Sequence, residues 1–273
     1  MKAAAFEYVR PADLAGAVKA LAGMPGEAKP LGGGQSLGPM LNLRLARPKL
    51  LVDVSRLESM RAIEDRGSLW RIGGAVTHSA IEDASLPGGE PLSSVARGIA
   101  YRTIRNRGTI GGSLAHADPA ADWPLALPAL GAEVVIAGPG GERRVTAATF
   151  MHGAFATALA EDELVVAVEV PKLSAGARWG YWKFCRKTGE FPEASAAVLL
   201  DAQRKVARLW VGALNGAPQP MEALAADLAQ RGGLAASEDA VSRALERVAP
   251  DLDPAQRRLH ITAVRRAVQQ ATE

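Results

Sequence analysis

The sequence predicts an α+β fold in two parts. Segments with the apolar spacing of helices and short apolar segments typical of strands are interleaved along the whole chain. The 273 residues are 48% hydrophobic, which is enough to bury a large core, and this length favours two domains over one. A short segment containing Pro, Ser and Gly, at 172–177, separates the two parts. We therefore predict an N-terminal domain over residues 1–174 and a C-terminal domain over residues 175–273.

The first hundred residues alternate between helical and strand patterns. Apolar residues at helical spacing predict a helix over 12–24. Short apolar runs predict strands at 50–54 and at 69–75. A second helix is predicted over 91–100. The next segment, 101–123, is too rich in Gly, Asn, Asp and Pro to form one regular element.

Strand patterns dominate the middle of the chain, and helices close it. Strands are predicted at 131–136 and 163–170, and Pro171 ends the second. Three further strand-like runs open the C-terminal part, at 180–186, 194–201 and 206–214. Two amphipathic helices are predicted last, over 238–248 and 254–269, and Ser237 is placed to cap the first of them.

Composition excludes several kinds of function. Cys185 is the only cysteine, so the chain alone cannot form a disulfide, a cysteine-ligated zinc site or an iron–sulfur cluster. The four histidines are far apart, and none has the spacing of metal ligands. Basic residues are scattered and the net charge is only +3, so we expect no nucleic-acid partner. We also expect no signal peptide and no membrane span, and hence a cytoplasmic protein. Any redox chemistry would need an organic cofactor.

The first candidate binding segment is the loop at 30–38, which contains the three consecutive glycines 32–34. Glycine allows positive φ and the close approach of a ligand, and the amides of such a turn can form an anion-binding nest. Gln35 and Ser36 add side-chain donors. A tight surface turn explains the three glycines as well, and for the glycines alone that interpretation is favoured.

A nicotinamide-dinucleotide fingerprint is a rival interpretation of the same loop. The spacing of Gly32, Gly34 and Gly38 is similar to that of the glycines in this fingerprint, and Asp53 follows about twenty residues later. The segment before the loop, 26–31, is a poor candidate for the buried parallel strand that this fingerprint requires. We therefore discount this alternative.

The second candidate segment, at 107–124, is dense in small and polar residues. Thr109 and Ser113 flank a Gly-Gly pair, so hydroxyls and bare amides can converge on a phosphate. Asp118 and Asp122 can accept hydrogen bonds from a ribose or an adenine amine. A capping turn, with Asp122 at the start of a helix, is an equally good interpretation. Two such loops in one chain favour a bridged pyrophosphate, and no Walker motif points to ATP or GTP.

Other polar residues carry weaker signals. Lys183 lies in a strand-like run, where a lysine is usually solvated, and a lone His116 is more often a structural hydrogen bonder than a base. We interpret Cys185, between aromatic neighbours, as a core thiol. The arginines of 102–107 are interpreted as surface charges. No acid–base constellation is present, so we predict no catalytic residue.

A family resemblance covers nearly the whole chain in order. The segments LGGGQSL at 31–37 with PMLNLRLARP at 39–48, and RGTIGGSLAHADPAAD at 107–122, resemble the two flavin segments of molybdopterin dehydrogenase FAD subunits. This family includes the medium subunits of aerobic carbon monoxide dehydrogenases and the FAD domains of xanthine dehydrogenases. Similarity continues through 162–166, 169–171, 181–186, Phe191, 194–198 and 256–267.

The resemblance implies a fold and a set of binding residues. The N-terminal domain would be a PCMH-type (vanillyl-alcohol-oxidase-type) FAD-binding domain with subdomains of about 1–56 and 57–174, followed by a carbon-monoxide-dehydrogenase-flavoprotein-like C-terminal domain. Residues 32–37 would wrap the pyrophosphate and ribitol, Leu164 would pack near the flavin, and Lys183 would reach its polar edge. The implied FAD-binding residues are Gly32, Gly33, Gly34, Gln35, Ser36, Leu37, Thr109, Gly112, Ser113, His116, Asp122, Leu164 and Lys183.

The implied function is electron transfer within a heterotrimeric molybdenum hydroxylase. A large molybdopterin-binding subunit would oxidise the substrate, and a small subunit with two [2Fe–2S] clusters would pass electrons to the FAD of this chain. An acceptor such as NAD⁺, oxygen or a quinone would then take them, and a dimer of heterotrimers is the implied assembly. Two alternatives stay open, namely a free-standing flavin oxidoreductase of the same fold and an NADP-binding module without catalytic activity.

Overall fold

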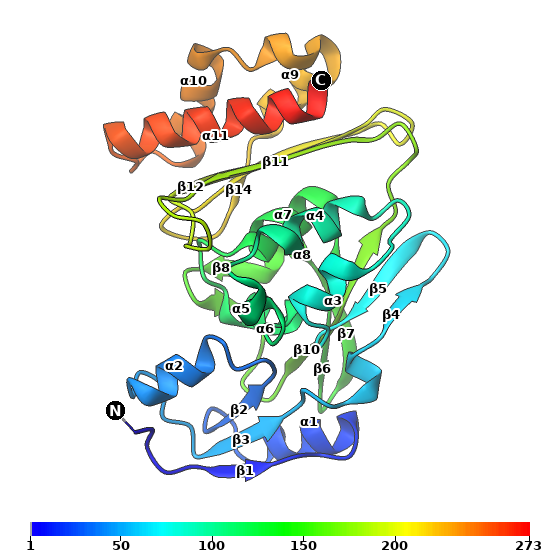
Figure 1. Ribbon diagram of the computed structural model, residues 1–273, viewed down its shortest axis with the longest axis vertical. Coiled ribbons are helices and arrows are strands. Elements are labelled where there is room, and N and C mark those ends of the chain that lie inside the picture. Colours follow the sequence, from blue (N-terminus) through cyan, green and yellow to red (C-terminus); the bar gives the residue numbers. More distant parts are fainter. Residues whose placement is uncertain (1) are drawn as a thin grey trace.

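A small parallel sheet forms the N-terminal end of the molecule (Figure 1). The structure is a computed structural model that describes residues 2–273. Strands β1 (Glu7–Val9) and β2 (Ala28–Leu31) both pair in parallel with the central β3 (Leu50–Asp53). Helix α1 (Leu14–Ala22) links the first two strands and confirms the predicted helix, and α2 (Leu37–Asn42) follows β2.

Strand β2 was not predicted from the sequence. We expected 26–31 to be a poor candidate for a buried parallel strand, and 28–31 does pair in parallel with β3, but as a strand that is mostly not buried. Only Ala28 of the four is buried, and β2 lies at the edge of the sheet, where Pro30 is tolerated. Because an exposed edge strand needs no apolar run, the hydropathy pattern could not reveal it.

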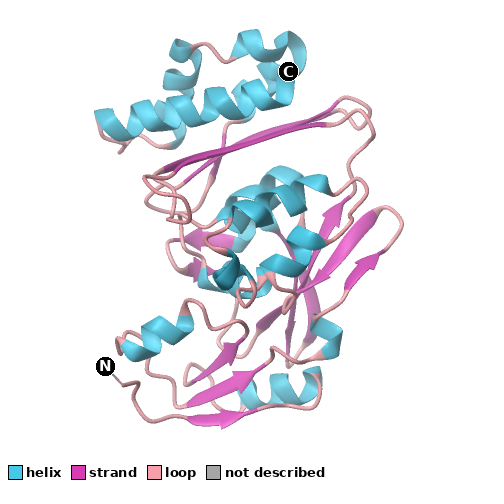
Figure 2. Cartoon of the chain, viewed as in Figure 1, coloured by secondary structure: helices cyan, strands magenta, loops and turns pink. Residues whose placement is uncertain are grey.

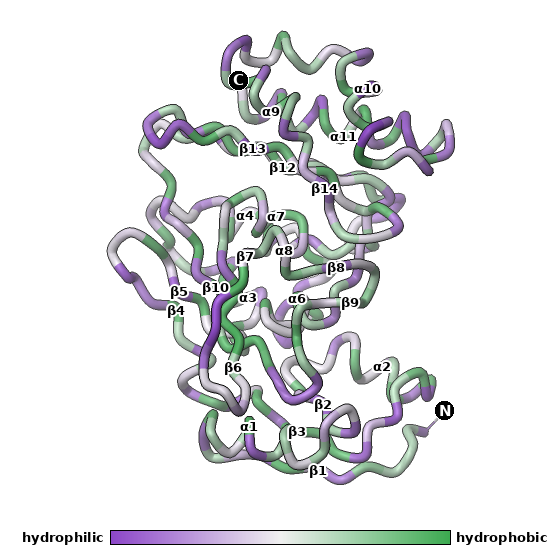
Figure 3. The backbone as a smooth tube through the Cα atoms, turned by 180° about the vertical axis from the view of Figure 1, so that it is seen from behind, coloured by the Kyte–Doolittle hydropathy of each residue, from purple (hydrophilic) through white to green (hydrophobic). Residues whose placement is uncertain are grey.

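An antiparallel sheet of five strands, in the order β4-β5-β10-β6-β7, forms the centre of the molecule. The predicted strands at 69–75, 131–136 and 163–170 are confirmed as β5, β6 and β10. Hydropathy follows burial, because the central β6 and β10 are apolar whereas the edge strand β7 is hydrophilic (Figure 3). The strands are β4 (Ile63–Asp65), β5 (Leu69–Gly73), β10 (Leu164–Pro171), β6 (Glu133–Gly138) and β7 (Gly141–Thr146).

Helices cover one face of this sheet (Figure 2). Their core includes the fully buried Trp123, Phe150 and Ile72. The other face packs on the parallel sheet through a second core that includes Val52, Val135 and Leu164. The covering helices and the small elements beside them are η1 (Glu58–Met60), α3 (His78–Asp83), α4 (Glu90–Gly98), α5 (Arg102–Arg105), α6 (Ile110–His116), α7 (Asp122–Leu130), α8 (Ala147–Phe150), β8 (Met151–Gly153) and β9 (Ala156–Thr157).

The C-terminal part is a four-stranded antiparallel sheet between two helical layers (Figure 2). One face packs on α11, where a Cβ on Gly180 would overlap the carbonyl oxygen of Ala267. The other face packs on α7 of the N-terminal part. The elements are β11 (Arg178–Phe184), β12 (Ala194–Asp201), β13 (Val206–Gly212), β14 (Gln219–Pro220), α9 (Glu222–Arg231), η2 (Gly232–Ala235), α10 (Glu238–Val248) and α11 (Pro254–Thr272).

The α+β prediction is confirmed, and so are the predicted C-terminal strands and helices. Ser237 caps α10 as predicted, because its side chain accepts a hydrogen bond from the Ala240 amide. The domain boundary near residue 174 stays a prediction, although β10 ends at Pro171 and β11 begins at Arg178. Over the described residues, no helix is both long and apolar enough to cross a bilayer.

Candidate cofactor site

The two glycine-rich loops, far apart in the sequence, meet in the structure. Strand β2 leads into the first loop, 32–36, and the backbone around Arg107 lies directly against it. A Cβ on Gly33 would overlap the Arg107 carbonyl oxygen, so only glycine permits this approach. The Arg107 Nε also donates to the Gly33 carbonyl oxygen at 3.4 Å. One ligand could therefore contact both segments.

The first loop presents unpaired backbone donors. Considering residues 2–273, no amide of 32–36 donates a hydrogen bond to a protein acceptor. Gly34 has a φ of +71°, which lies in the region that favours glycine. The Gln35 Nε2 donates to the Gly33 carbonyl oxygen at 3.4 Å, while Ser36 is exposed and makes no capping bond with its side chain. Successive free amides in such a turn are the arrangement that binds anions.

The second loop is anchored by hydrogen bonds of its own backbone. The Thr109 hydroxyl caps α6 by accepting from the Gly112 amide at 3.1 Å. The Gly111 amide donates to the Gly74 carbonyl oxygen at 3.0 Å, and a Cβ on Gly111 would lie only 2.6 Å from that oxygen. Gly111 is therefore required for close packing. Gly112 is exposed, so it is the glycine of this pair that a ligand can reach.

Ser113 and His116 lie on one side of α6, three residues apart, and both are partly exposed. The His116 imidazole packs against the Phe155 ring, with 5.2 Å between the ring centroids. Ala117 ends the helix in the left-handed conformation, with a φ of 50°. Like the exposed Gly112, these two side chains are not fully buried, so a ligand can reach them.

Asp122 and Lys183 form an ion pair that joins the two parts of the chain. Asp122 begins α7 and is buried, and its Oδ1 accepts from the Lys183 Nζ at 2.7 Å. The same oxygen accepts from the Tyr181 hydroxyl at 2.6 Å. Lys183 also donates to the Gly98 carbonyl oxygen at 2.9 Å. Burial and the neighbouring Asp122 carboxylate raise the pKa of Tyr181 well above its usual value. The alternative interpretation, in which Lys183 is an ordinary solvated lysine, is therefore excluded, because its side chain is only 16% exposed, and its contact with the flavin stays a prediction.

Leu164 occupies a different environment from the other candidates. Its side chain is 2% exposed and packs in the core between the parallel and antiparallel sheets. It pairs with Ala137 at the start of β10. The structure thus gives Leu164 a packing role, and its contact with the flavin stays a prediction.

Asp53 is occupied by neighbouring side chains, which removes support from the nicotinamide alternative. The carboxylate is 5% exposed and accepts from the Tyr8 hydroxyl, from the Arg10 Nε at 3.2 Å and from Ser55. Burial raises the pKa of Asp53, but the hydrogen bonds from Ser55, Tyr8 and Arg10 outweigh it and lower the pKa below its ordinary value. A carboxylate with these partners is not free to bind a ribose.

Buried polar groups support the second loop from behind. Arg105, which we expected at the surface, is 9% exposed, binds Glu82 with its Nε at 2.7 Å and donates to the carbonyl oxygens of Ile99 and Ala100. Charged residues are rarely buried without such partners. The sequence of 102–107 has no apolar pattern from which the burial of Arg105 could be predicted. Cys185, which we expected in the core, is partly exposed, and burial raises the pKa of its thiol.

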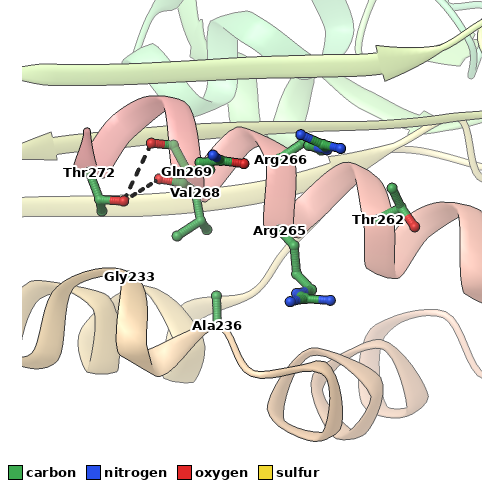
Figure 4. Close-up of a pocket in the computed structure, with 8 residues that line it drawn as sticks. All are labelled: Gly233, Ala236, Thr262, Arg265, Arg266, Val268, Gln269 and Thr272. Carbon is green, nitrogen blue, oxygen red and sulfur yellow. Dashed lines mark hydrogen bonds between the residues drawn. The ribbon is translucent and has the colours of Figure 1, made fainter.

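A well-defined cavity lies elsewhere, at the C-terminal helices, and carries no comparable chemistry. A hollow of about 520 Å³ separates α11 from the segment around Gly233 and Ala236 (Figure 4). Arg265 and Gln269 at its wall are exposed, and the Thr272 hydroxyl donates to its own helix at the Val268 carbonyl oxygen. No cluster of His, Cys, Asp and Glu suited to a metal ion is found among residues 2–273.

Comparisons with known proteins place this geometry in a family. Residues 4–173 match the model described as "FAD binding domain in molybdopterin dehydrogenase". The chain is 38% identical over 219 residues to the carbon monoxide dehydrogenase medium chain of Hydrogenophaga pseudoflava, covering 78% of this chain and 75% of the relative. It is 36% identical to the nicotine 6-hydroxylase medium subunit of Paenarthrobacter nicotinovorans, covering 79% and 77%.

Solved structures agree over the whole chain. Reconstituted CO dehydrogenase from Oligotropha carboxidovorans superposes with a TM-score of 0.90 at 31% identity, covering 100% of this chain and 99% of that one. Quinoline 2-oxidoreductase from Pseudomonas putida 86 gives 0.88 at 30%, covering 100% and 98%. The fold and paired glycine loops are those of a flavoprotein oxidoreductase subunit, and the chain belongs to the FAD-binding molybdopterin dehydrogenase family. Within that family it is a medium, FAD-binding subunit of the molybdenum hydroxylases.

Proposed function

We propose that this chain binds FAD between its two glycine loops and carries electrons from partner subunits to an external acceptor. The observation that carries the proposal is the junction at Gly33, where free amides of one loop lie beside the capped helix start of the other. Two phosphates of a dinucleotide can use two adjacent donor groups, whereas a single phosphate needs only one.

The predicted residues of the two loops can be given roles that suit their surroundings, whereas Leu164 lies in the core. The amides of residues 32–36 would bind the pyrophosphate, and the Thr109 hydroxyl, which already accepts from Gly112, would donate its proton to a phosphate oxygen. Ser113 and His116 would contact the adenosine side. Side-chain donors and acceptors of this kind fix the orientation of a cofactor without reacting with it.

The Asp122–Lys183 pair would lie at the polar edge of the flavin. Lys183 brings a cation from the C-terminal sheet to the start of α7, and Asp122 and the Gly98 carbonyl oxygen hold it there. The ammonium has three N–H donors, so the one not used by Asp122 or Gly98 could donate a hydrogen bond to the polar edge of the isoalloxazine. Bound FAD supplies the chemistry that accepts single electrons and delivers a pair.

The relatives' names support an assembly of several subunits. Those relatives are the medium subunits of carbon monoxide dehydrogenase and nicotine 6-hydroxylase. We propose that a small [2Fe–2S] subunit and a large molybdopterin subunit assemble with this chain, as a dimer of heterotrimers. The cytoplasm as the site of this complex stays a prediction.

Cofactor titration of the purified chain tests the proposal. FAD, FMN and NADP are added separately, and binding is followed by flavin fluorescence and absorption. Tight binding of FAD alone, without turnover of small substrates, supports the proposal. Turnover without partners would favour a free-standing oxidoreductase, and binding of NADP without FAD would favour the nicotinamide module. If the isolated chain binds nothing, the flavin content of the native complex decides.

A pull-down tests the partner assignment separately. The tagged chain, expressed in its own host, is expected to retain two proteins that carry iron, labile sulfide and molybdenum. Recovery of the FAD-loaded chain without any metal-containing partner would contradict the assignment while leaving the FAD site intact.

A further inference from the structure

His78 is a buried polar residue that none of the proposed cofactor contacts uses. It begins α3 directly after Thr77 and is 5% exposed. Its backbone amide donates to the Gly108 carbonyl oxygen at 2.9 Å, and Thr77 and Thr109 form an isolated antiparallel bridge. The start of α3 is thus tied by backbone bonds to the second glycine loop.

The imidazole of His78 packs directly under that loop. A Cβ on Gly108 would lie 2.8 Å from the His78 Cδ2 and 2.9 Å from its Nε2, so the ring occupies the space that a side chain would need. The loop therefore rests on the ring itself, one residue before Thr109.

The opposite edge of the ring is bonded to Trp123. The Trp123 Nε1 donates to the His78 Nδ1 at 3.1 Å, and Trp123 is fully buried. Since an indole N–H can only donate, Nδ1 must accept, and the neutral ring carries its proton on Nε2. Burial, and then the positive charge of Arg105, lower the pKa of His78 to about 4, so the ring is neutral at pH 7.

Trp123 lies next to Asp122 in the chain, as Gly108 lies next to Thr109. His78 therefore connects the loop that presents Thr109 with the helix start that presents Asp122 and, through it, Lys183. A single side chain thus links the two ends of the second candidate segment, where two predicted cofactor contacts lie.

We propose that His78 is a positioning residue, which acts through Trp123 and Gly108 to set the spacing between Thr109 and Asp122 in the cofactor site. The proposal rests on the proposed function, because Thr109 and Asp122 matter only if they hold FAD. His78 itself would not contact the cofactor.

Three single variants and one double variant of the full chain separate the effect of the hydrogen bond from that of the bulk of the ring. His78→Phe keeps the ring and removes the acceptor, Trp123→Phe removes the donor, and His78→Asn keeps an acceptor close to the position of Nδ1. We expect each Phe variant to weaken FAD binding about five- to tenfold, as for a lost buried hydrogen bond. The double Phe variant should be no weaker than the poorer single variant, because one bond is removed only once. His78→Asn should stay within about threefold of wild type, since it keeps that bond.

Two measurements that need no cofactor keep the test independent of the proposed function. Amide hydrogen exchange at 108–112 should become faster in both Phe variants and stay slow in His78→Asn. The ¹⁵N spectrum of the wild-type chain at pH 7 should show a neutral His78 with the proton on Nε2.

Each result has a defined meaning. Folded Phe variants that bind FAD within twofold of wild type, additive losses in the double variant, or a proton on Nδ1 would each overturn the assignment of His78. If wild type itself, in the chain and in the native complex, holds no FAD, the proposed function fails. In that case exchange at 108–112 still decides whether His78 supports the loop.

Discussion

The two glycine loops share a sequence signature but use their glycines differently. In the first loop, glycines 32–34 leave a run of amides without protein acceptors, and Gly33 lets the second loop approach. In the second loop, Gly108 and Gly111 give room to the His78 ring and to the Gly74 backbone, and only Gly112 is exposed. The first loop supplies hydrogen-bond donors, whereas the second loop packs on the buried His78 ring and on the backbone of Gly74. A glycine-rich motif therefore indicates that another group lies close to the backbone, but it does not show whether that group belongs to a ligand or to the protein itself.

The largest effect is expected at the junction of the loops. Gly33→Ala places a Cβ on the Arg107 carbonyl oxygen, so the loops must separate, at a cost of about 1–3 kcal/mol or more. We expect FAD binding to be lost. Gly38→Ala is the matched control, because nothing lies within 4 Å of its Cβ and Gly38 is in α2, where alanine is the better helix former. Equal FAD affinity in the two variants would contradict the claim that FAD binding needs the close contact of the two loops at Gly33.

The next largest effect is a loss of folding stability at acid pH, caused by the buried His78 that supports the second loop. The folded pKa of His78, about 4, lies below its unfolded value of 6.5, because burial disfavours the charged ring. The unfolded chain therefore binds the proton first as the pH falls, and stability decreases from pH 6.5 to pH 4 by up to about 3 kcal/mol. The slope of unfolding free energy against pH should be smaller in His78→Phe, as measured by urea unfolding. An unchanged slope between pH 6.5 and 4.5 would count against a buried neutral ring.

A moderate effect is expected at the link between the two parts of the chain. Lys183→Ala leaves the buried Asp122 carboxylate with only the Tyr181 hydroxyl, which costs about 1–3 kcal/mol. The chain should still fold, but its flavin affinity or reduction should change. Asp122→Asn combined with Lys183→Met should be less destabilised than the sum of the single variants, since the charges compensate each other. Wild-type flavin spectra and turnover in Lys183→Ala would return this lysine to a structural role.

The smallest effect compares two helix caps. Thr109 caps α6 in the site and Ser237 caps α10 far from it, each through a side-chain oxygen. Thr109→Val and Ser237→Ala should each lower the unfolding free energy by about 1 kcal/mol. Only the Thr109 variant should weaken FAD binding. A similar loss of affinity in both would show that stability alone, and not the loop, controls binding.

Much of the fold could be predicted because burial leaves a periodic pattern. The strands at 163–170 and 194–201 are nearly all buried and read as apolar runs, and the helix at 238–248 has an apolar stripe and a capping serine. The edge strand β2 has no such pattern. Helix α9 does have one, with Leu224, Ala225 and Leu228 on its buried side, and a spacing count over 222–231 would have found it.

The site was predictable where residues act locally and not where they act across the chain. A glycine-rich loop can be recognised in the sequence, whereas the contact between Arg107 and Gly33 depends on the tertiary structure. Tyr181 and His78 gave no local signal either, since a buried tyrosine or histidine looks like any core residue until its partner, Asp122 or Trp123, is known.

An experimental structure of the chain with FAD tests the central claim most directly. We predict pyrophosphate oxygens within hydrogen-bonding distance of the amides of residues 32–36 and of the Thr109 hydroxyl, with the isoalloxazine ring toward Lys183. FAD bound elsewhere, with those amides contacting only water, would contradict it.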